Sequence, residues 1–66
     1  MNFRYRMEVN NRNRSYVVYD TKLFTNDFPE GRHVHSFSGG EFSRFDSLVK
    51  SAKQEYDIAP QNIVYL

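Results

Sequence analysis

The stretch from residue 3 to residue 9, FRYRMEV, decides the fold, because apolar and polar side chains alternate along it without interruption. One side of this stretch carries Phe3, Tyr5, Met7 and Val9, and the other carries Arg4, Arg6 and Glu8. A period of two is typical of a strand with one face in the core and one face open. The pattern therefore predicts a first strand over Asn2 to Val9.

A hairpin follows this strand. The run Asn10–Arg14 reads NNRNR and contains no apolar residue, and its asparagines tolerate the left-handed backbone of a tight reversal. Ser15–Thr21, SYVVYDT, is rich in β-branched and aromatic residues and predicts a second strand. Its apolar residues fall on both faces, so the pattern leaves open which side is buried.

Lys22–Arg32 predicts a long loop, because the sequence FPEG within it combines a proline that fixes φ with a glycine that permits reversal. This loop carries Leu23, Phe24 and Phe28. Such side chains either fold back onto the core or form an exposed patch for a partner. The small size of the domain favours folding back, whereas exposure would make protein binding the leading function.

The second half of the chain predicts a short strand, a helix and a last strand. The strand spans His33–Ser38 and ends at Gly39 and Gly40, and the last strand spans Asn62–Leu66. Between them, apolar residues recur three or four positions apart and predict a helix over Ser43–Tyr56. Ser43 and Asp46 are spaced as a capping box, and Pro60 prevents continuation of the helix. The apolar stripe consists of Phe42, Phe45, Leu48, Val49, Ala52 and Tyr56.

The element order predicts one α+β domain over residues 1–66, a small antiparallel sheet of three to four strands with one helix packed on one face (β-β-β-α-β). A chain of 66 residues without cysteine has to stabilise its core without disulfides. We therefore expect a monomer or a homodimer, in which the apolar last strand could lie at a sheet edge and pair with a second copy.

Composition limits the partners and the compartment. A formal net charge of +1 disfavours a general polyanion binder, whose charge is usually one-sided. The absence of cysteine suits a reducing cytoplasm, and the chain contains no apolar run long enough for a signal peptide or a membrane span. We expect a cytoplasmic protein without membrane contact.

The candidates for catalysis and metal binding are few. His33 and His35 lie two positions apart, so a regular strand would project both imidazoles from one face, a spacing that metal sites use. A third ligand would have to come from Asp20, Asp27 or Glu41, and nothing in the sequence places one nearby. The serines are better explained as caps or as polar surface residues. We expect no enzymatic activity, no metal and no cofactor.

Four arginines stand in the first hairpin, interleaved with Tyr5 and Tyr16. Guanidinium groups bind phosphates and exposed rings stack on bases, so this cluster is the best nucleic-acid candidate. The alternative interpretation is that arginines on an open sheet face keep a small protein soluble. The cluster consists of Arg4, Arg6, Arg12 and Arg14.

The segment Tyr16–Lys22, YVVYDTK, followed by a short strand and by a helix with Phe45 and Ala52, resembles small accessory proteins of bacteriophages and mobile elements. The resemblance extends over most of the chain. It implies a host-takeover or anti-defence role, in which a small stable fold binds a host enzyme or an RNA-guided immune complex and blocks it. These proteins share no functional motif, so no residue role carries over.

Three antiparallel strands followed by a helix are also similar to the arm-type DNA-binding domains of phage and transposon integrases. That resemblance implies a sheet face that enters the major groove. The chain departs from those domains in its nearly neutral charge and in the strand after its helix. The reading face would comprise Arg4, Arg6, Tyr16, Val18 and His33 or His35.

These observations lead us to expect a non-enzymatic interaction protein that binds a host protein or nucleoprotein complex through its open sheet face and adjoining loops. The alternative is a nucleic-acid-binding domain that reads DNA with the same arginine-bearing face. Arginines would provide charge complementarity and aromatic rings would provide buried anchors. The expected contact residues are Arg4, Arg6, Arg12, Arg14, Tyr16, Phe24 and Phe28.

Overall fold

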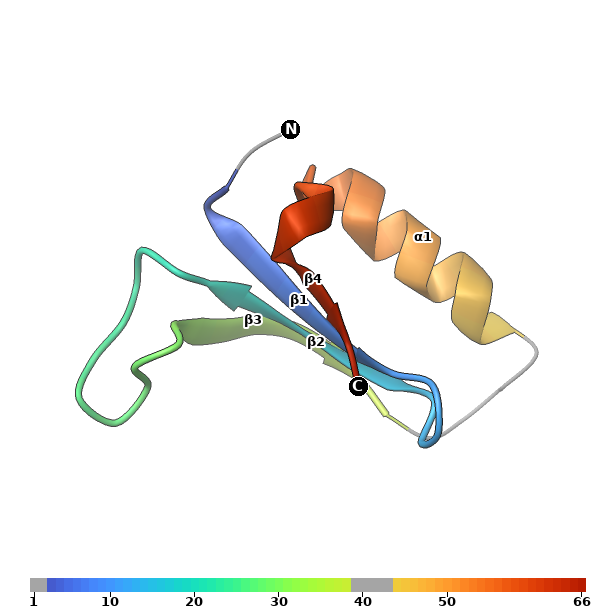
Figure 1. Cartoon of the computed structure of the whole chain (residues 1–66), viewed down its shortest axis with the longest axis horizontal. Helices are drawn as coiled ribbons and strands as arrows, with labels where there is room; N and C mark the ends of the chain where they lie inside the picture. Colours follow the sequence, from blue (N-terminus) through green and yellow to red (C-terminus); the bar gives the residue numbers. More distant parts are fainter. Residues whose placement is uncertain (1–2, 39–43) are drawn as a thin grey trace.

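The chain forms a four-stranded mixed sheet with one helix laid across one of its faces, an α+β arrangement of two layers (Figure 1). The computed structural model describes residues 3–38 and 44–66. The sheet order is β3-β2-β1-β4. The elements are β1 (Tyr5–Asn10), β2 (Ser15–Asp20), β3 (Arg32–Phe37), α1 (Phe45–Glu55), the 3-10 helix η2 (Pro60–Asn62) and β4 (Ile63–Tyr65).

The sheet confirms the predicted order of elements but is not wholly antiparallel. β1 pairs antiparallel with β2, whereas β4 lies at the edge and runs parallel to β1. The Asn62 side-chain amide donates to the carbonyls of Phe3 and Tyr5 at 3.2 and 3.1 Å. These bonds position the start of β4 beside β1. The Leu66 amide continues the ladder with a bond to the Val9 carbonyl at 2.7 Å.

The core lies between the helix and the sheet, and the predicted helix stripe is confirmed where the structure describes it. Leu48 and Tyr56 pack partly buried against the core. In β2, Tyr16 and Val18 face the helix, because they pair with the buried residues Val9 and Met7 of β1. The core residues are Met7, Val9, Tyr16, Val18, Phe45, Val49, Ala52 and Ile58.

Phe3 was predicted to belong to the core face, and this prediction is wrong. Phe3 is 63% exposed, and β1 begins at Tyr5 rather than at Asn2. Backbone pairing starts where the Thr21 amide donates to the Arg4 carbonyl at 2.9 Å. Phe3 therefore lies beyond the paired part of the sheet.

The helix ends at the predicted position, with Tyr56 as its C-cap, in a Schellman motif that precedes Pro60. The amides of Asp57 and Ile58 donate to the carbonyls of Gln54 and Lys53 at 3.2 and 3.1 Å, and Asp57 adopts a left-handed φ of 50°. The predicted capping residue Ser43 lies outside the described residues, as do Gly39, Gly40, Glu41 and Phe42. No helix in the described ranges is long and apolar enough to cross a membrane.

The β1–β2 connection is the predicted hairpin, with a different residue in the left-handed conformation. The Asn10 side-chain oxygen accepts from the amides of Arg12 and Asn13 at 3.0 and 3.1 Å, which closes the turn. The positive φ, 54°, belongs to Arg14. Asparagine therefore stabilises this turn through its side chain, not through its backbone freedom.

Candidate partner-binding site

The connection between β2 and β3, residues 21–31, is called the aromatic loop here, and its base is fixed by a buried carboxylate. Arg4 donates to Asp20 through Nε at 3.0 and 3.1 Å and through a terminal nitrogen at 2.8 Å. The Lys22 amide donates to the same carboxylate at 3.1 Å. The Arg4 hydrogen bond, supported by that amide, lowers the pKa of Asp20 below its ordinary value.

Gly31 closes the other end of the loop base. Its φ is +116°, and a Cβ at this position would lie 2.6 Å from the Asp20 carbonyl oxygen and 2.9 Å from the Thr21 Cα. Only glycine allows this backbone conformation and this close approach. The two ends of the aromatic loop are therefore held against each other.

The tip of the aromatic loop is ordered by its own hydrogen bonds. The amides of Thr25 and Phe28 donate to each other's carbonyls at 3.3 and 3.1 Å, and the Thr25 hydroxyl oxygen also accepts from the Phe28 amide at 3.2 Å. The Gly31 amide donates to the Phe28 carbonyl at 3.1 Å. These bonds give the loop a defined shape at both its base and its tip.

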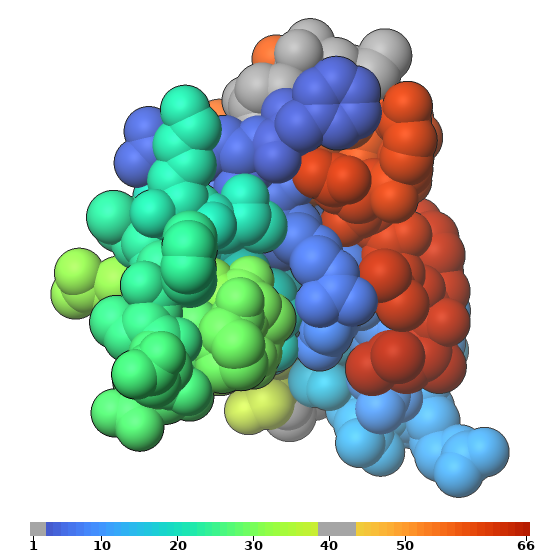
Figure 2. Space-filling model, turned by 60° about the vertical axis from the view of Figure 1, so that its left-hand side comes forward, coloured from blue at the N-terminus to red at the C-terminus, as the bar shows by residue number. Residues whose placement is uncertain are grey.

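The aromatic loop presents its apolar side chains to solvent. Phe24 is 66% exposed, Phe28 is 50% exposed and Leu23 is 46% exposed. Figure 1 shows the loop projecting beyond the sheet, and Figure 2 shows the same green segment standing out at the side of the molecule. The preference for folding back onto the core is therefore wrong, and the alternative of an exposed apolar patch is the one that the structure shows, on a loop shaped by its own hydrogen bonds.

Part of the core that the loop was expected to supply comes from another segment. Ile58 and Ala59, between α1 and η2, are buried against the sheet. Neither residue was predicted to be buried, because both follow the helical stripe and precede Pro60. Because Ile58 and Ala59 fill this part of the core, the core does not need Phe24 and Phe28.

An aromatic contact connects the loop to the open face of the sheet. The His33 ring meets Tyr19 edge-on at a centroid distance of 4.6 Å and Phe28 at 6.1 Å. Tyr19 is buried here, and its hydroxyl donates to Glu8 at 3.1 Å. Burial, with a smaller contribution from this bond, raises the pKa of the Tyr19 phenol. Arg6 pairs with the same Glu8 at 3.0 Å.

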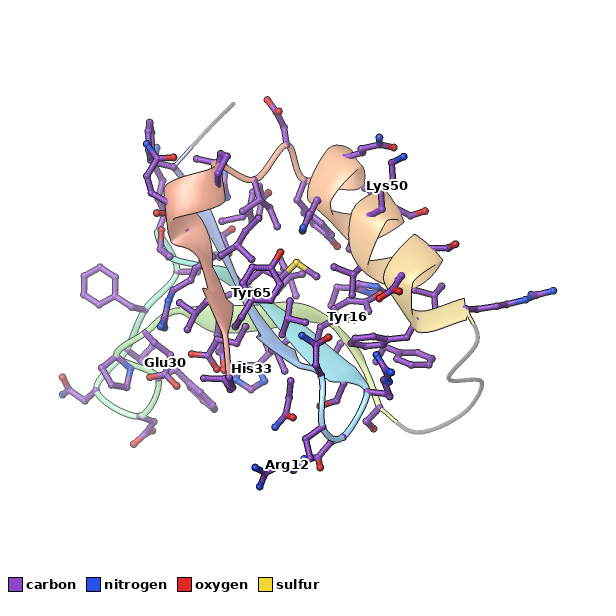
Figure 3. All side chains as sticks on the ribbon, turned by 45° about the vertical axis from the view of Figure 1, so that its right-hand side comes forward. Arg12, Tyr16, Glu30, His33, Lys50 and Tyr65 are labelled. Atoms are coloured by element: carbon purple, nitrogen blue, oxygen red, sulfur yellow. The ribbon has the colours of Figure 1, made fainter. Side chains whose placement is uncertain are left out.

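The four predicted arginines do not form one surface. Arg4 and Arg12 lie beyond opposite ends of β1, and Figure 3 shows Arg12 projecting from the hairpin turn. Arg6 pairs with Glu8 on the open face, and the guanidinium carbon of Arg14 lies 5.6 Å from the ring centroid of the helical Phe45. Arg4 is exposed and Arg6 is half-buried, and both already bind carboxylates.

Tyr16 and Val18 do not belong to the exposed surface that was predicted for them. Both are buried on the helix side of the sheet. The Tyr16 hydroxyl lies 2.8 Å from the His35 Nε2, and burial raises the pKa of the Tyr16 phenol. These residues therefore stabilise the fold, whereas Phe24 and Phe28 remain available to a partner.

The two histidines lie on opposite faces of the sheet, which corrects the prediction of a shared face. Val18 pairs with His35 and Tyr19 pairs with His33, so Val34 is the extra residue of a β-bulge. A bulge shifts the alternation of side chains by one position. In the described ranges, histidine, aspartate and glutamate form no group of three that could hold a metal, and no pocket is found there.

The sequence pattern did not reveal the role of Asp20 in fixing the loop, whereas the positive φ of Gly31 confirms the prediction that this glycine permits the reversal. Asp20 ends the second strand of the hairpin, and Arg4 precedes the first strand at the same end, so their opposite charges were a usable signal for the ion pair. Comparison of the chain with family models, curated proteins and solved structures returns no match.

Proposed function

We propose that this chain is a non-enzymatic interaction domain that binds a host protein or nucleoprotein complex through the aromatic loop and occludes the bound surface. The observation that carries the proposal is the exposure of Leu23, Phe24 and Phe28 on a loop whose base and tip are both fixed. Exposed apolar groups normally oppose solubility, so a structured segment that displays them is typical of an interface. The occluding role rests on the resemblance to phage accessory proteins.

A fixed loop also favours affinity, because association then orders fewer side chains and less backbone. Phe24 and Phe28 are the expected anchors, since aromatic side chains that enter a partner's pocket dominate many interfaces. The open face beside the loop, with the Arg6–Glu8 ion pair and the exposed His33, would supply a polar rim. This arrangement supports contact with a protein surface better than contact with phosphates.

The experiment is an affinity capture from native source cells with the wild-type chain and with Phe24→Ser. The matched control is Ser51→Phe, the reverse substitution, which adds an exposed ring to α1 and leaves the aromatic loop unchanged. A partner retained by the control and lost by Phe24→Ser supports the proposal. Equal retention by wild type, Phe24→Ser and Phe28→Ser would refute it.

A titration with single-stranded and duplex DNA at two salt concentrations tests the nucleic-acid alternative. Neutralisation of several phosphates gives affinity that falls steeply with salt. Because the arginines are dispersed over two ends and two faces, we expect weak binding. Tight binding with a steep salt slope, abolished by Arg6→Glu or Arg12→Glu, would favour nucleic acid over protein as the partner.

A further inference from the structure

The charges on the aromatic loop are arranged unevenly. Asp27 lies within the Thr25–Phe28 turn at the tip, and Glu30 follows Pro29. Both acids are exposed, and within residues 3–38 and 44–66 neither forms an ion pair. The basic residues nearest in sequence, Lys22 and Arg32, stand at the base of the loop.

The exposed apolar side chains alternate with these acids in the sequence FTNDFPE, residues 24–30. An aromatic anchor flanked by carboxylates fits an apolar pocket bordered by positive charge, because complementary charges steer encounter and like charges repel. Asp27 at the tip and Glu30 beside Gly31 are exposed to solvent and form no ion pair among the described residues, whereas Asp20 and Glu8 already bind arginines. The tip is thus the acidic part of the exposed loop.

From this arrangement we infer that the aromatic loop inserts Phe24 or Phe28 into an apolar pocket of a partner protein whose border carries lysine or arginine, with Asp27 and Glu30 facing that border. The inference rests on the proposed function and adds the chemistry of the partner. A negatively charged partner, such as nucleic acid or an anionic membrane, is disfavoured at this site, because the loop tip would repel it.

The first experiment locates the partner's contact surface. A photoreactive benzoyl-phenylalanine replaces Phe24 in the full chain, and the crosslinked peptide is identified by mass spectrometry after irradiation in native source cells. The same group at Ser51 is the control for random contact. The expected result is a crosslink specific to position 24, within reach of lysine or arginine on the partner.

The second experiment measures the affinity of the identified partner for matched charge variants. Asp27→Lys and Glu55→Lys change the net charge equally, but Glu55 lies at the end of α1, away from the loop. We expect Asp27→Lys to weaken binding about fivefold at low salt and less at high salt, because exposed charge pairs are modest and screened. Glu55→Lys should leave the affinity within about twofold.

The outcomes separate the two proposals. If position 24 crosslinks nothing beyond the Ser51 control, both the proposed function and this inference fail. If a specific partner is found but its contact surface is acidic, or if Asp27→Lys binds it as tightly as wild type, the interaction function stands and the basic pocket is refuted. Loss with Asp27→Lys, but not with Glu55→Lys, supports the inference.

Discussion

The helix-covered face of the sheet and the aromatic loop carry the same kinds of side chains but differ in exposure. Phe45 of α1 is fully buried against Tyr16 and Phe37, whereas Phe24 is 66% exposed. The buried rings lie between α1 and the sheet. The exposed rings lie on the aromatic loop, which is ordered by its own hydrogen bonds. The difference shows that the number of aromatic residues in the sequence does not indicate which of them stabilise this domain.

Removing a ring from the core should destabilise the domain far more than removing one from the aromatic loop. Phe45→Ala should lower the free energy of unfolding by about 3–5 kcal/mol, because it leaves a cavity in the core. A domain of this size has a free energy of unfolding of only about 3–10 kcal/mol, so the variant should lose a large share of its stability. Urea unfolding followed by circular dichroism measures the effect. A loss below about 1 kcal/mol would show that the helix does not close the core.

The next largest effect should come from the loop base. Gly31→Ala places a Cβ against the Asp20 carbonyl in a backbone conformation that alanine rarely adopts. We expect a loss of about 1–3 kcal/mol in the free energy of unfolding, measured by thermal and urea denaturation. Asn26→Ala, an exposed change in the same loop, should be nearly neutral. Equal stability of the two variants would contradict the fixed base.

The ion pair at the loop base predicts a pH dependence. The folded pKa of Asp20 is lowered, so its stabilising contribution is complete above the ordinary pKa of about 3.8 and is lost as pH falls through the folded value. The wild-type urea midpoint should therefore fall more steeply below pH 4 than that of Asp20→Asn. Parallel acid profiles for the two chains would mean that the Arg4–Asp20 pair contributes no stability of its own.

The smallest change in stability is expected at the loop tip. Phe24→Ala should change the free energy of unfolding by no more than about 0.5 kcal/mol, since the ring is mostly solvated and contributes little to the core. The same urea measurement as for Phe45→Ala provides the direct comparison. A destabilisation of several kcal/mol would assign Phe24 to the core and remove the basis for the interaction site.

The regular part of the fold could be predicted from periodicity, and the irregular part could not. Alternation around Met7 and helical spacing around Val49 correctly placed β1 and α1, because both patterns reflect repeated burial of one face. The parallel pairing of β4 depends on contacts such as Asn62 with Phe3, which no local pattern encodes. The bulge at Val34 places His33 and His35 on opposite faces of the sheet, and no sequence pattern indicates it.

The candidate site was predicted only in outline. Phe24 and Phe28 were singled out, but their exposure depends on hydrogen bonds within the loop and on core residues supplied by Ile58. The arginines were grouped because they are close in sequence. The hairpin separates Arg6 from Arg14, since one lies on the open face and the other packs toward the helix.

The parallel pairing of β4 with β1 has a consequence for the order in which the molecule assembles. Val9 pairs with Tyr65, which lies far along the sequence, so a nascent polypeptide leaves this side of β1 without its neighbour until β4 has been synthesised. Contacts between residues so distant in sequence slow folding and prolong the exposure of unpaired strands. For this protein, the interval between synthesis of the hairpin and synthesis of β4 is when off-pathway association would compete most strongly with folding.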